Sequence, residues 1–243
     1  MKNFTKTGFY ISSKIGKAIQ NYKLINNGDR ILIGISGGKD SLSLLSLLKE
    51  RQRWAPVKFE LAACHILADF DKNNQKHRQI IDKLCKKLGI KCYFKKIKVL
   101  DKNKKTNCFW CSWNRRKELF LLAGKLGFNK IMLGHHMDDI IETTLLNLFF
   151  NGEISTMNPC QKLFNGQLTV IRPLCYVEEC KMQQFAKENK LPIINCNCPI
   201  KEESSRKHIK NLIKNLQKKC PAVKMNIFKS ITRIRKDYLD IKI

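Results

Sequence analysis

The sequence predicts an α/β protein built on a parallel sheet, with a basic helical extension toward the C-terminus. Short apolar runs that suit strands buried on both faces alternate with segments whose apolar residues recur at helical spacing. This alternation favours strand–helix–strand units with right-handed crossovers. It stops near residue 151, and residues 200–243 carry 13 Lys and Arg against four Asp and Glu.

The first half of the chain supplies the alternating elements. A helix over 12–26 is expected first, because its apolar residues have helical spacing and the turn signal "NNGD" follows. The elements after it are predicted in this order: strand 30–36, a helix beginning near Asp40, strand 59–69, helix 75–90 closed by Gly89, strand 91–100, helix 115–128, strand 130–136 and helix 138–150.

The second half is less regular. Residues 151–174 predict a loop and a hairpin, 177–190 a helix and 191–199 an extended segment, and basic helices follow. We therefore expect three parts: an N-terminal helical segment over 1–28, an α/β domain over 29–180 and a C-terminal helical region over 181–243.

The charge of the chain indicates a polyanionic partner. With 47 Lys and Arg against 20 Asp and Glu, the net charge is +27, which favours nucleic acid over neutral small molecules. The alternative is an AT-rich coding sequence that inflates Lys and Asn throughout. The sequence shows no signal peptide and no apolar run of membrane-spanning length, so we expect a reducing, cytoplasmic setting. The eleven cysteines are then buried side chains or metal ligands rather than disulfides.

The strongest local signal is "ILIGISGGKDS", in which a buried strand runs into a glycine turn and a helix. Gly37 and Gly38 let the backbone approach a phosphate, and the N-terminus of the following helix favours an anion. The polar residues of the loop have distinct expected tasks: Ser36 and Ser41 donate hydrogen bonds to phosphate oxygens, Lys39 supplies charge and Asp40 holds Mg²⁺. The alternative is an ordinary turn whose serines cap the helix.

"SGGKDS" resembles the PP-loop motif of the N-type ATP pyrophosphatases. The resemblance implies a Rossmann-like fold of the adenine nucleotide alpha hydrolase type over 29–180. It also implies that ATP is cleaved between its α- and β-phosphates, that a substrate oxygen is adenylated, and that a nucleophile then replaces this oxygen.

A pair of cysteines, Cys108 and Cys111, precedes two arginines in "CFWCSWNRR". From the spacing alone the pair suits zinc, a redox dithiol or an iron–sulfur site. Four stretches resemble the tRNA-cytidine 2-sulfurtransferase family: "GKAIQNYKLINNGDRILIGISGGKDS", "CFWCSWNRR", "LGHHMDDIIETTLLNLFFNG" and "RPLCYVEE". The tail "LPIINCNCPIKEESSRKHIKNLI" is similar to the C-terminal cysteine segment of that family. The resemblance covers residues 10–230.

That family thiolates a cytidine in the tRNA anticodon loop, and the resemblance carries its features over to this chain. It implies ATP-dependent conversion of C32 to 2-thiocytidine by adenylation of O2, and sulfur transfer from a [4Fe–4S] cluster. The implied cluster ligands are Cys108, Cys111 and Cys198, with Cys196 as the alternative third ligand. Three thiolates leave one iron open for a sulfur species, whereas four would close the cluster. The implied partners are tRNA, a cysteine desulfurase or other sulfur donor, and a second copy of the chain.

Polar side chains follow the predicted strand 130–136 in "GHHMDD". The carboxyl end of a parallel strand points into the ligand-binding crevice of an open α/β sheet, so Asp138 is the candidate second Mg²⁺ ligand or orienting carboxylate. Asp139, His135 and Glu142 lie nearby in sequence, and His136 suits packing and function equally.

Arg115 and Arg116 follow the CxxC by one helical turn. We expect their guanidinium groups to clamp an RNA phosphate or to neutralise the adenylated intermediate. The basic C-terminal helices are expected to hold the rest of the tRNA by phosphate contacts, and their alternative role is a solvated surface. Trp110 and Trp113 shield the cluster or belong to the core. Seven cysteines have no motif and are interpreted as structural or incidental: Cys64, Cys85, Cys92, Cys160, Cys175, Cys180 and Cys220.

Three rival functions stay open at this point. A tRNA lysidine synthetase also has SGGxDS and an HHxDD-like stretch but needs no cluster. A 2-thiouridine synthetase of archaeal type adds terminal zinc-finger cysteine pairs that are missing here. A non-enzymatic, zinc-bearing RNA-binding protein would explain the charge and cysteines, but not the complete loop from Ser36 to Ser41.

Overall fold

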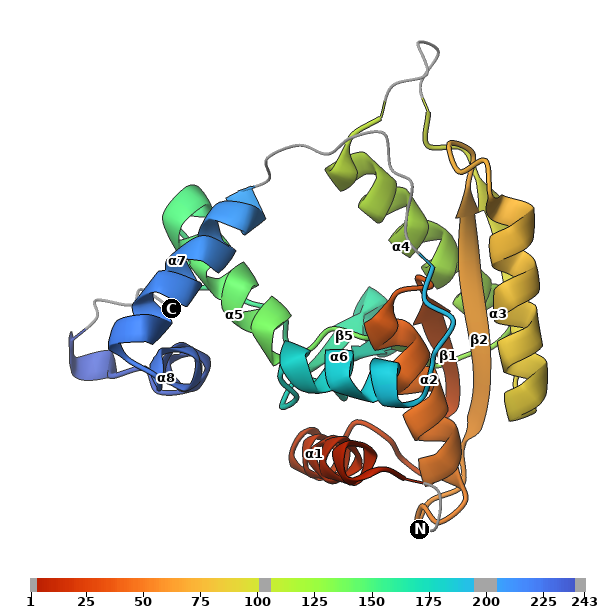
Figure 1. Cartoon of the computed structure of the whole chain (residues 1–243), viewed down its shortest axis with the longest axis horizontal. Helices are drawn as coiled ribbons and strands as arrows, with labels where there is room; N and C mark the ends of the chain where they lie inside the picture. The colour runs from red at the N-terminus through yellow and green to blue at the C-terminus, as the bar shows by residue number, and fades with distance from the viewer. Residues whose placement is uncertain (1–3, 101–105, 195–204, 239–243) are drawn as a thin grey trace. The chain divides into compact units, whose positions relative to one another are not determined.

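The computed structural model of the chain (Figure 1) describes residues 4–100, 106–194 and 205–238, apart from the side chains of Cys108 and Lys236. Its contacts divide the chain into two compact units. The first comprises Met1–His136 and Pro159–Lys201, and the second comprises Met137–Asn158 and Glu202–Ile243. Each unit is therefore built from two separate segments of sequence. The three-part division expected from the sequence stays a prediction.

The first unit is organised around a sheet, six-stranded in the described residues, with the order β3-β2-β1-β4-β6-β5. Strand β5 pairs antiparallel with β6, and the other pairings are parallel. The strands are β1 (Arg30–Ile35), β2 (Glu60–Ala68), β3 (Lys91–Ile97), β4 (Lys130–Met132), β5 (Cys160–Leu163) and β6 (Leu168–Ile171). The predicted parallel sheet is confirmed, as is the hairpin predicted within 151–174.

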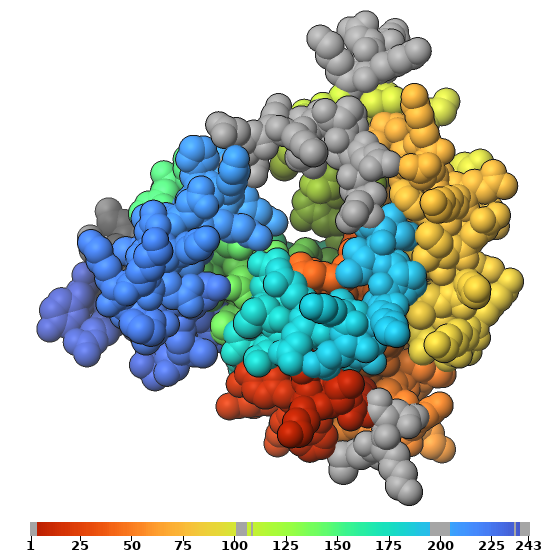
Figure 2. Space-filling model, in the orientation of Figure 1, coloured from red at the N-terminus to blue at the C-terminus, as the bar shows by residue number. Residues whose placement is uncertain are grey.

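Helices cover both faces of this sheet. α2 (Lys39–Gln52) packs on β1, and α3 (Asn74–Leu88) packs on β2 and β3 and forms part of the surface in Figure 2. α4 (Cys108–Lys125) contacts β2, β3 and β4. The connection from β3 through α4 to β4 crosses the sheet in the direction opposite to the connections from β1 to β2 and from β2 to β3. Because such connections are right-handed, α4 lies on the opposite face from α2 and α3. α1 (Lys6–Tyr22) and α6 (Glu179–Glu188) pack on α2 and on each other.

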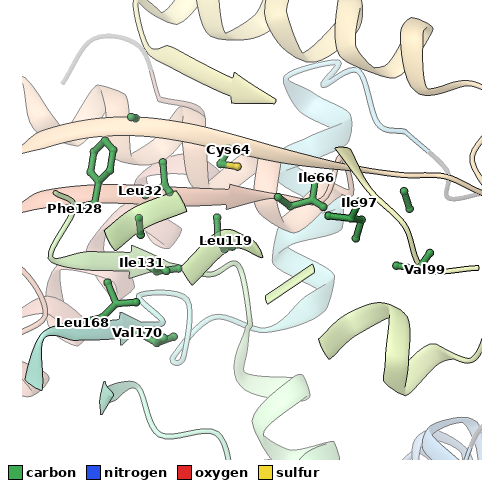
Figure 3. Close-up of a cluster of buried hydrophobic side chains, with 13 residues drawn as sticks. Leu32, Cys64, Ile66, Ile97, Val99, Leu119, Phe128, Ile131, Leu168 and Val170 are labelled. Atoms are coloured by element: carbon green, nitrogen blue, oxygen red, sulfur yellow. The ribbon is translucent and has the colours of Figure 1, made fainter. Parts of the chain in front are cut away.

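One hydrophobic core of the first unit lies between α4 and the sheet (Figure 3), and it positions the site. Alternate residues of β2, among them Cys64 and Ile66, point to the same side, as the period of a strand requires. They meet Leu119 of α4 and Ile131 of β4, both almost completely buried. This packing fixes the position of α4 relative to the carboxyl ends of the strands.

Two helix boundaries differ from the sequence-based expectation. α1 begins at Lys6, because the Thr5 hydroxyl accepts the Gly8 N–H at 3.1 Å, and it ends at Tyr22, before Lys23, which has a φ of 49°. α4 begins at Cys108 instead of residue 115, because the Asn107 side chain accepts the Trp110 N–H at 2.7 Å. The CxxC therefore occupies the first turn of α4 rather than a preceding loop.

The second unit is helical. It contains α5 (Met137–Leu146), α7 (Ser205–Lys219) and α8 (Val223–Ser230). Residues 137, 141 and 145 follow one another at helical spacing and pack against Ile209 and Ile213 of α7. The helix predicted over 138–150 turns into a π-helical turn, η1 (Asn147–Asn151), which leaves Leu148, Phe149 and Phe150 exposed.

The remaining segments are short or not covered. Two 3₁₀ turns, η2 (Phe164–Gly166) and η3 (Lys236–Tyr238), complete the described elements. The strand predicted over 130–136 is regular only to Met132. Of the extended segment predicted over 191–199, residues 195–199 lie outside the described residues. Across the described ranges, every helix is too short or too polar to cross a membrane.

Candidate active site

The phosphate loop lies where β1 ends and α2 begins, as predicted. Gly37 has a φ of +88°, which favours glycine, and a Cβ there would lie 3.0 Å from the Cβ of Ile194. The N–H of Ile194 donates to the carbonyl of Gly37 at 2.9 Å. The segment after α6 therefore packs directly on the loop and holds it in a shape that only glycine fits.

The two loop serines bond to each other and to the loop backbone. Ser36 Oγ and Ser41 Oγ are 3.1 Å apart, and Ser36 Oγ accepts the N–H of Gly38 at 3.2 Å. Ser41 Oγ donates to the carbonyl of Gly38 at 3.0 Å. Both hydroxyl groups thus line the turn at the N-terminus of α2, where the first N–H groups of a helix lack partners within the helix.

Lys39 is held by two carboxylates. Its Nζ lies 3.0 Å from Oε1 of Glu179 and 3.2 Å from Oδ2 of Asp40. Burial lowers the pKa of Lys39, but the hydrogen bonds and charges of Glu179 and Asp40 outweigh burial and raise it above its ordinary value. Lys39 is therefore a permanent cation beside the loop. Glu179 was not singled out from the sequence, although it ends the stretch "RPLCYVEE".

The segment after β4 also reaches the loop. A Cβ on Gly134 would lie 3.1 Å from the backbone N of Ser41, so this position needs glycine for close approach. His136 Nε2 lies 3.9 Å from Oδ1 of Asp40. The structure thus brings Asp40 and His136 together, whereas His135 accepts a hydrogen bond from Nε of Arg172 at 3.3 Å.

Arg115 and Arg116 line a cavity of about 130 Å³ that also contacts Ser36. Other walls of this cavity come from the ends of β1 and β2, through Ile35 and Ile66. Arg115 Nε is buried and forms no hydrogen bond with the described residues, and the guanidinium group lies 5.9 Å from the Phe70 ring centre. Two cations from α4 therefore border the phosphate loop.

Two further residues near the cavity lined by Arg115 and Arg116 were not identified from the sequence. Arg172 is 7% exposed, and burial together with the charge of Arg116 lowers its pKa to about 10. His65 donates through Nδ1 to the carbonyl of Ile35 at 2.7 Å, which holds the last residue of β1 in place. Burial, with the charge of Arg115, lowers the pKa of His65. The only feature of the sequence that could have identified Arg172 or His65 is that each is a single polar residue within an apolar run.

The candidate cluster ligands are described in part. Cys108 and Cys111 are three residues apart on α4, so their positions lie on one face of the helix. Cys111 is half-buried and packs against the core beneath α4. Cys196 and Cys198 lie outside the described residues. Thiolates are the usual ligands of iron–sulfur clusters, and the N-terminus of α4 favours negatively charged groups, so the donor set fits a cluster.

Of the other aromatic and cysteine residues discussed from the sequence, the two tryptophans of α4 lie outside the core, and Cys64 and Cys175 are buried. Trp110 and Trp113 stack with ring centres 5.5 Å apart and are 48% and 41% exposed, which excludes the core alternative. Burial raises the pKa of Cys64 and Cys175 to about 12, in agreement with structural roles. Within the described residues, no three His, Cys, Asp or Glu side chains form a group that could hold a metal ion.

The acidic residues of α5 contact cations of their own unit. Asp138 Oδ1 lies 2.6 Å from Lys224 Nζ, and Asp139 Oδ1 lies 4.0 Å from a guanidinium nitrogen of Arg206. Glu142 lies 3.5 Å from Lys210 and 3.9 Å from Arg206. Burial raises the pKa of Glu142 in spite of these cations. An ammonium group thus occupies one side of Asp138, and its predicted role toward Mg²⁺ stays a prediction.

Comparison with known proteins agrees with this geometry. The model of the PP-loop domain family matches residues 10–217. The chain is 38% identical over 237 residues to the tRNA-cytidine(32) 2-sulfurtransferase of Geobacter sulfurreducens, covering 94% of this chain and 91% of that protein. It is 37% identical to the protein of the same name from Geotalea uraniireducens, covering 94% and 93%.

Among solved structures, the U34-tRNA thiolase NcsA from Methanococcus maripaludis, solved with its [4Fe–4S] cluster, has the same fold. It superposes with a TM-score of 0.79 at 22% identity, covering 99% of this chain and 84% of that one.

Proposed function

The chain belongs to the PP-loop domain family and, within it, to the tRNA-cytidine(32) 2-sulfurtransferases; from this membership we propose that it replaces O2 of cytidine 32 in tRNA with sulfur. It is therefore a transferase. Membership favours this function over the lysidine synthetase, the 2-thiouridine synthetase and the non-enzymatic RNA-binding alternatives.

One observation in the first unit supports the proposal most directly. The cavity beside Ser36 is walled by Arg115 and Arg116, which lie on the same helix as Cys108 and Cys111. The loop for ATP and the helix for the cluster thus meet at one corner of the sheet. A lysidine synthetase or a non-enzymatic RNA-binding protein would not require a cysteine-bearing helix beside the phosphate loop.

The loop residues would bind and activate ATP. The backbone of Gly37 and Gly38 and the hydroxyl groups of Ser36 and Ser41 hold the pyrophosphate portion, and Lys39 neutralises part of its charge. Asp40, in the first turn of α2, would hold Mg²⁺. These residues orient the α-phosphorus toward the incoming oxygen of the base.

The chemistry is an adenylation followed by a displacement. O2 of the cytidine attacks the α-phosphorus, the bond to the β-phosphate oxygen breaks, and pyrophosphate leaves. A sulfur nucleophile then adds at C2, and AMP leaves with the original oxygen. Arg115 and Arg116 stabilise the negative charge that develops in both steps. A [4Fe–4S] cluster on Cys108, Cys111 and Cys198 would supply the sulfur nucleophile.

The partners of the reaction follow from the same proposal. tRNA is the substrate, and a cysteine desulfurase or another donor replenishes the sulfur. We also propose a homodimer. Its support is the exposed apolar group on and after the π-helical turn, where Leu148, Phe149, Phe150 and Ile154 are 45–70% exposed.

Iron and sulfide analysis of protein purified without oxygen tests the function. We expect about four irons and four sulfides per chain, and loss of both in Cys198→Ala. Thiolation of a tRNA transcript should be lost in the same variant. Cys180→Ala, at an exposed cysteine without a motif, is the matched control and should retain both.

Asp40→Ala separates the ATP site from the cluster in the same experiment, since it should keep the iron and lose thiolation. Loss of iron only in Cys196→Ala would move the third ligand without changing the function. Zinc in place of iron, or thiolation without iron, would contradict the proposal.

A further inference from the structure

The most basic part of the first unit lies away from the loop, on α3 and β3. Residues 72–98 contain ten Lys and Arg and a single acidic residue, Asp82. All ten cationic side chains are exposed. These ten residues are called the α3–β3 basic face below; Lys91 and Lys95 lie on the side of β3 that carries Tyr93 and Ile97 and faces α4. Its density of charge exceeds that of residues 200–243, which hold 13 basic and four acidic residues over a longer stretch.

Few of these cations have a counter-ion. Lys86 pairs with Asp82 at 2.7 Å, and Lys95 lies 3.8 Å from Glu118. The other eight form no ion pair with any described residue. Cations held close together on a surface repel one another, and this repulsion is relieved when a polyanion binds.

The basic face borders a groove of about 830 Å³. Four cations line it, Arg78, Lys86, Lys96 and Lys98, together with the amides of Gln75 and Gln79. Cations and amide donors are the groups that bind the phosphate and ribose of a nucleic acid. A groove of this size is larger than a single phosphate needs and suits a length of sugar–phosphate backbone.

The carboxylates that also line the groove have other contacts. Asp69 accepts the backbone N–H groups of Val99 and Leu100 at 3.0 and 3.3 Å. Asp82 is the partner of Lys86. Their charges are thus directed at groups of the protein, and the cations at the groove remain in excess.

The position of one cation is fixed in advance. The Arg78 guanidinium lies over the ring of Phe94, 5.1 Å from its centre. Such a contact orients the planar group and leaves its N–H edge available. Lysines on an edge strand such as β3 also prevent pairing with other chains, but this explanation does not extend to the cations of α3.

The groove and the phosphate loop lie at the same edge of the sheet. Leu67, Lys96 and Lys98 place the groove at the carboxyl ends of β2 and β3, and the loop follows the carboxyl end of the neighbouring β1. An RNA strand bound along the basic face therefore lies along the edge that carries the loop.

From this geometry we infer that the α3–β3 basic face is a docking surface for the sugar–phosphate backbone of RNA. The inference deepens the proposed function and rests on it for the identity of the RNA as the tRNA substrate. The face contributes phosphate contacts outside the catalytic corner, and its contribution to binding falls as salt rises.

The test compares two triple variants of the full chain for binding to an unmodified tRNA transcript over a range of salt. Arg78→Gln, Lys96→Gln and Lys98→Gln together should weaken binding at least about tenfold near physiological salt and lower the salt slope by about two to three. The matched control removes three exposed charges from α1 and α6: Lys6→Gln, Lys17→Gln and Lys187→Gln. It should change affinity much less, and equal weakening in both variants would overturn the inference.

A second measurement uses the unaltered protein, so that it does not depend on the folding of a variant. A lysine-acetylating reagent should modify Lys96 and Lys98 more slowly when tRNA is bound, and unchanged rates would overturn the inference. Measuring thiolation at saturating tRNA, for the wild-type chain and for the face variant, separates the proposed function from the proposed docking surface. If the wild-type chain fails to thiolate but the face variant still loses affinity, the proposed function fails and the docking surface stands.

Discussion

Residues 72–98 and residues 205–238 are basic to a similar degree in sequence but differ in what surrounds their cations. The first stretch has ten Lys and Arg with one acidic residue, and the second has eleven with one. In the second, three cations meet the carboxylates of α5: Lys224 meets Asp138, Arg206 meets Asp139, and Lys210 meets Glu142. On the α3–β3 basic face, eight of the ten form no ion pair with described residues.

The difference shows that charge density in a sequence does not measure the charge available to a ligand. Counter-ions can come from a distant segment, as α5 supplies them to α7 and α8 within the second unit. The basic C-terminal helices predicted to hold tRNA therefore devote part of their charge to their own packing. Their role in tRNA binding stays a prediction.

The largest expected effect comes from removing a paired cation. Lys224→Met leaves the Asp138 carboxylate, whose side chain is 6% exposed, without the ammonium group at 2.6 Å. We expect a loss of about 2 kcal/mol of stability, because a buried carboxylate is costly without its partner. Urea unfolding measures it. Lys98→Met on the basic face is the matched control and should stay within about 0.5 kcal/mol. Similar losses in both variants would remove the distinction between the two regions.

A smaller effect is expected from releasing cations in the second unit. Glu142→Gln removes one largely buried carboxylate from beside Lys210 and Arg206, while Arg206 still lies 4.0 Å from Asp139. We expect tRNA affinity to rise a few-fold, with a steeper salt dependence, and stability to change little because the charge was already costly to bury. Filter binding and urea unfolding measure the two quantities. Glu153→Gln, at an exposed residue of the same unit, makes the same change in net charge and should leave affinity nearly unaltered.

The smallest effect is a difference in the response to acid. The pKa of His65 in the first unit is lowered by burial, so the unfolded chain binds the proton more readily, and stability falls as pH drops below about 6.5. The pKa of Glu142 in the second unit is raised by burial, so the folded chain binds the proton more readily, and its contribution to stability rises as pH falls toward 4.5.

Hydrogen exchange at pH 7 and pH 5.5, corrected for the intrinsic rates, checks both directions. Protection should decrease in β1 and β2 relative to α5. His65→Gln should remove the decrease in the first unit, and a decrease of equal size in that variant would contradict the assignment.

The parallel sheet could be predicted because its strands are continuous apolar runs and its helices have apolar faces. The phosphate loop could be predicted because glycines between a buried strand and a helix have few other uses. In both cases the signal lies within about ten residues of sequence, and the structure confirms the strand, the glycine turn and the helix.

Other features depend on contacts between distant residues and could not be predicted. The CxxC was expected before a helix over 115–128, but the Asn107 cap starts α4 at Cys108. The pairing of Lys39 with Glu179 joins residues 140 positions apart. The contact of Asp138 with Lys224 joins residues 86 positions apart, and neither sequence segment signals the other.

The second unit, with its two separate segments, also constrains how the chain is made. α5 leaves the ribosome well before α7, and during that interval the apolar side chains of Met137, Ile141 and Leu145 have not yet met Ile209 and Ile213. Nascent chains that expose an apolar face are prone to aggregate and are substrates for chaperones. Chains stopped before residue 205 would keep that face uncovered, so premature termination leaves an aggregation-prone product rather than a smaller soluble domain.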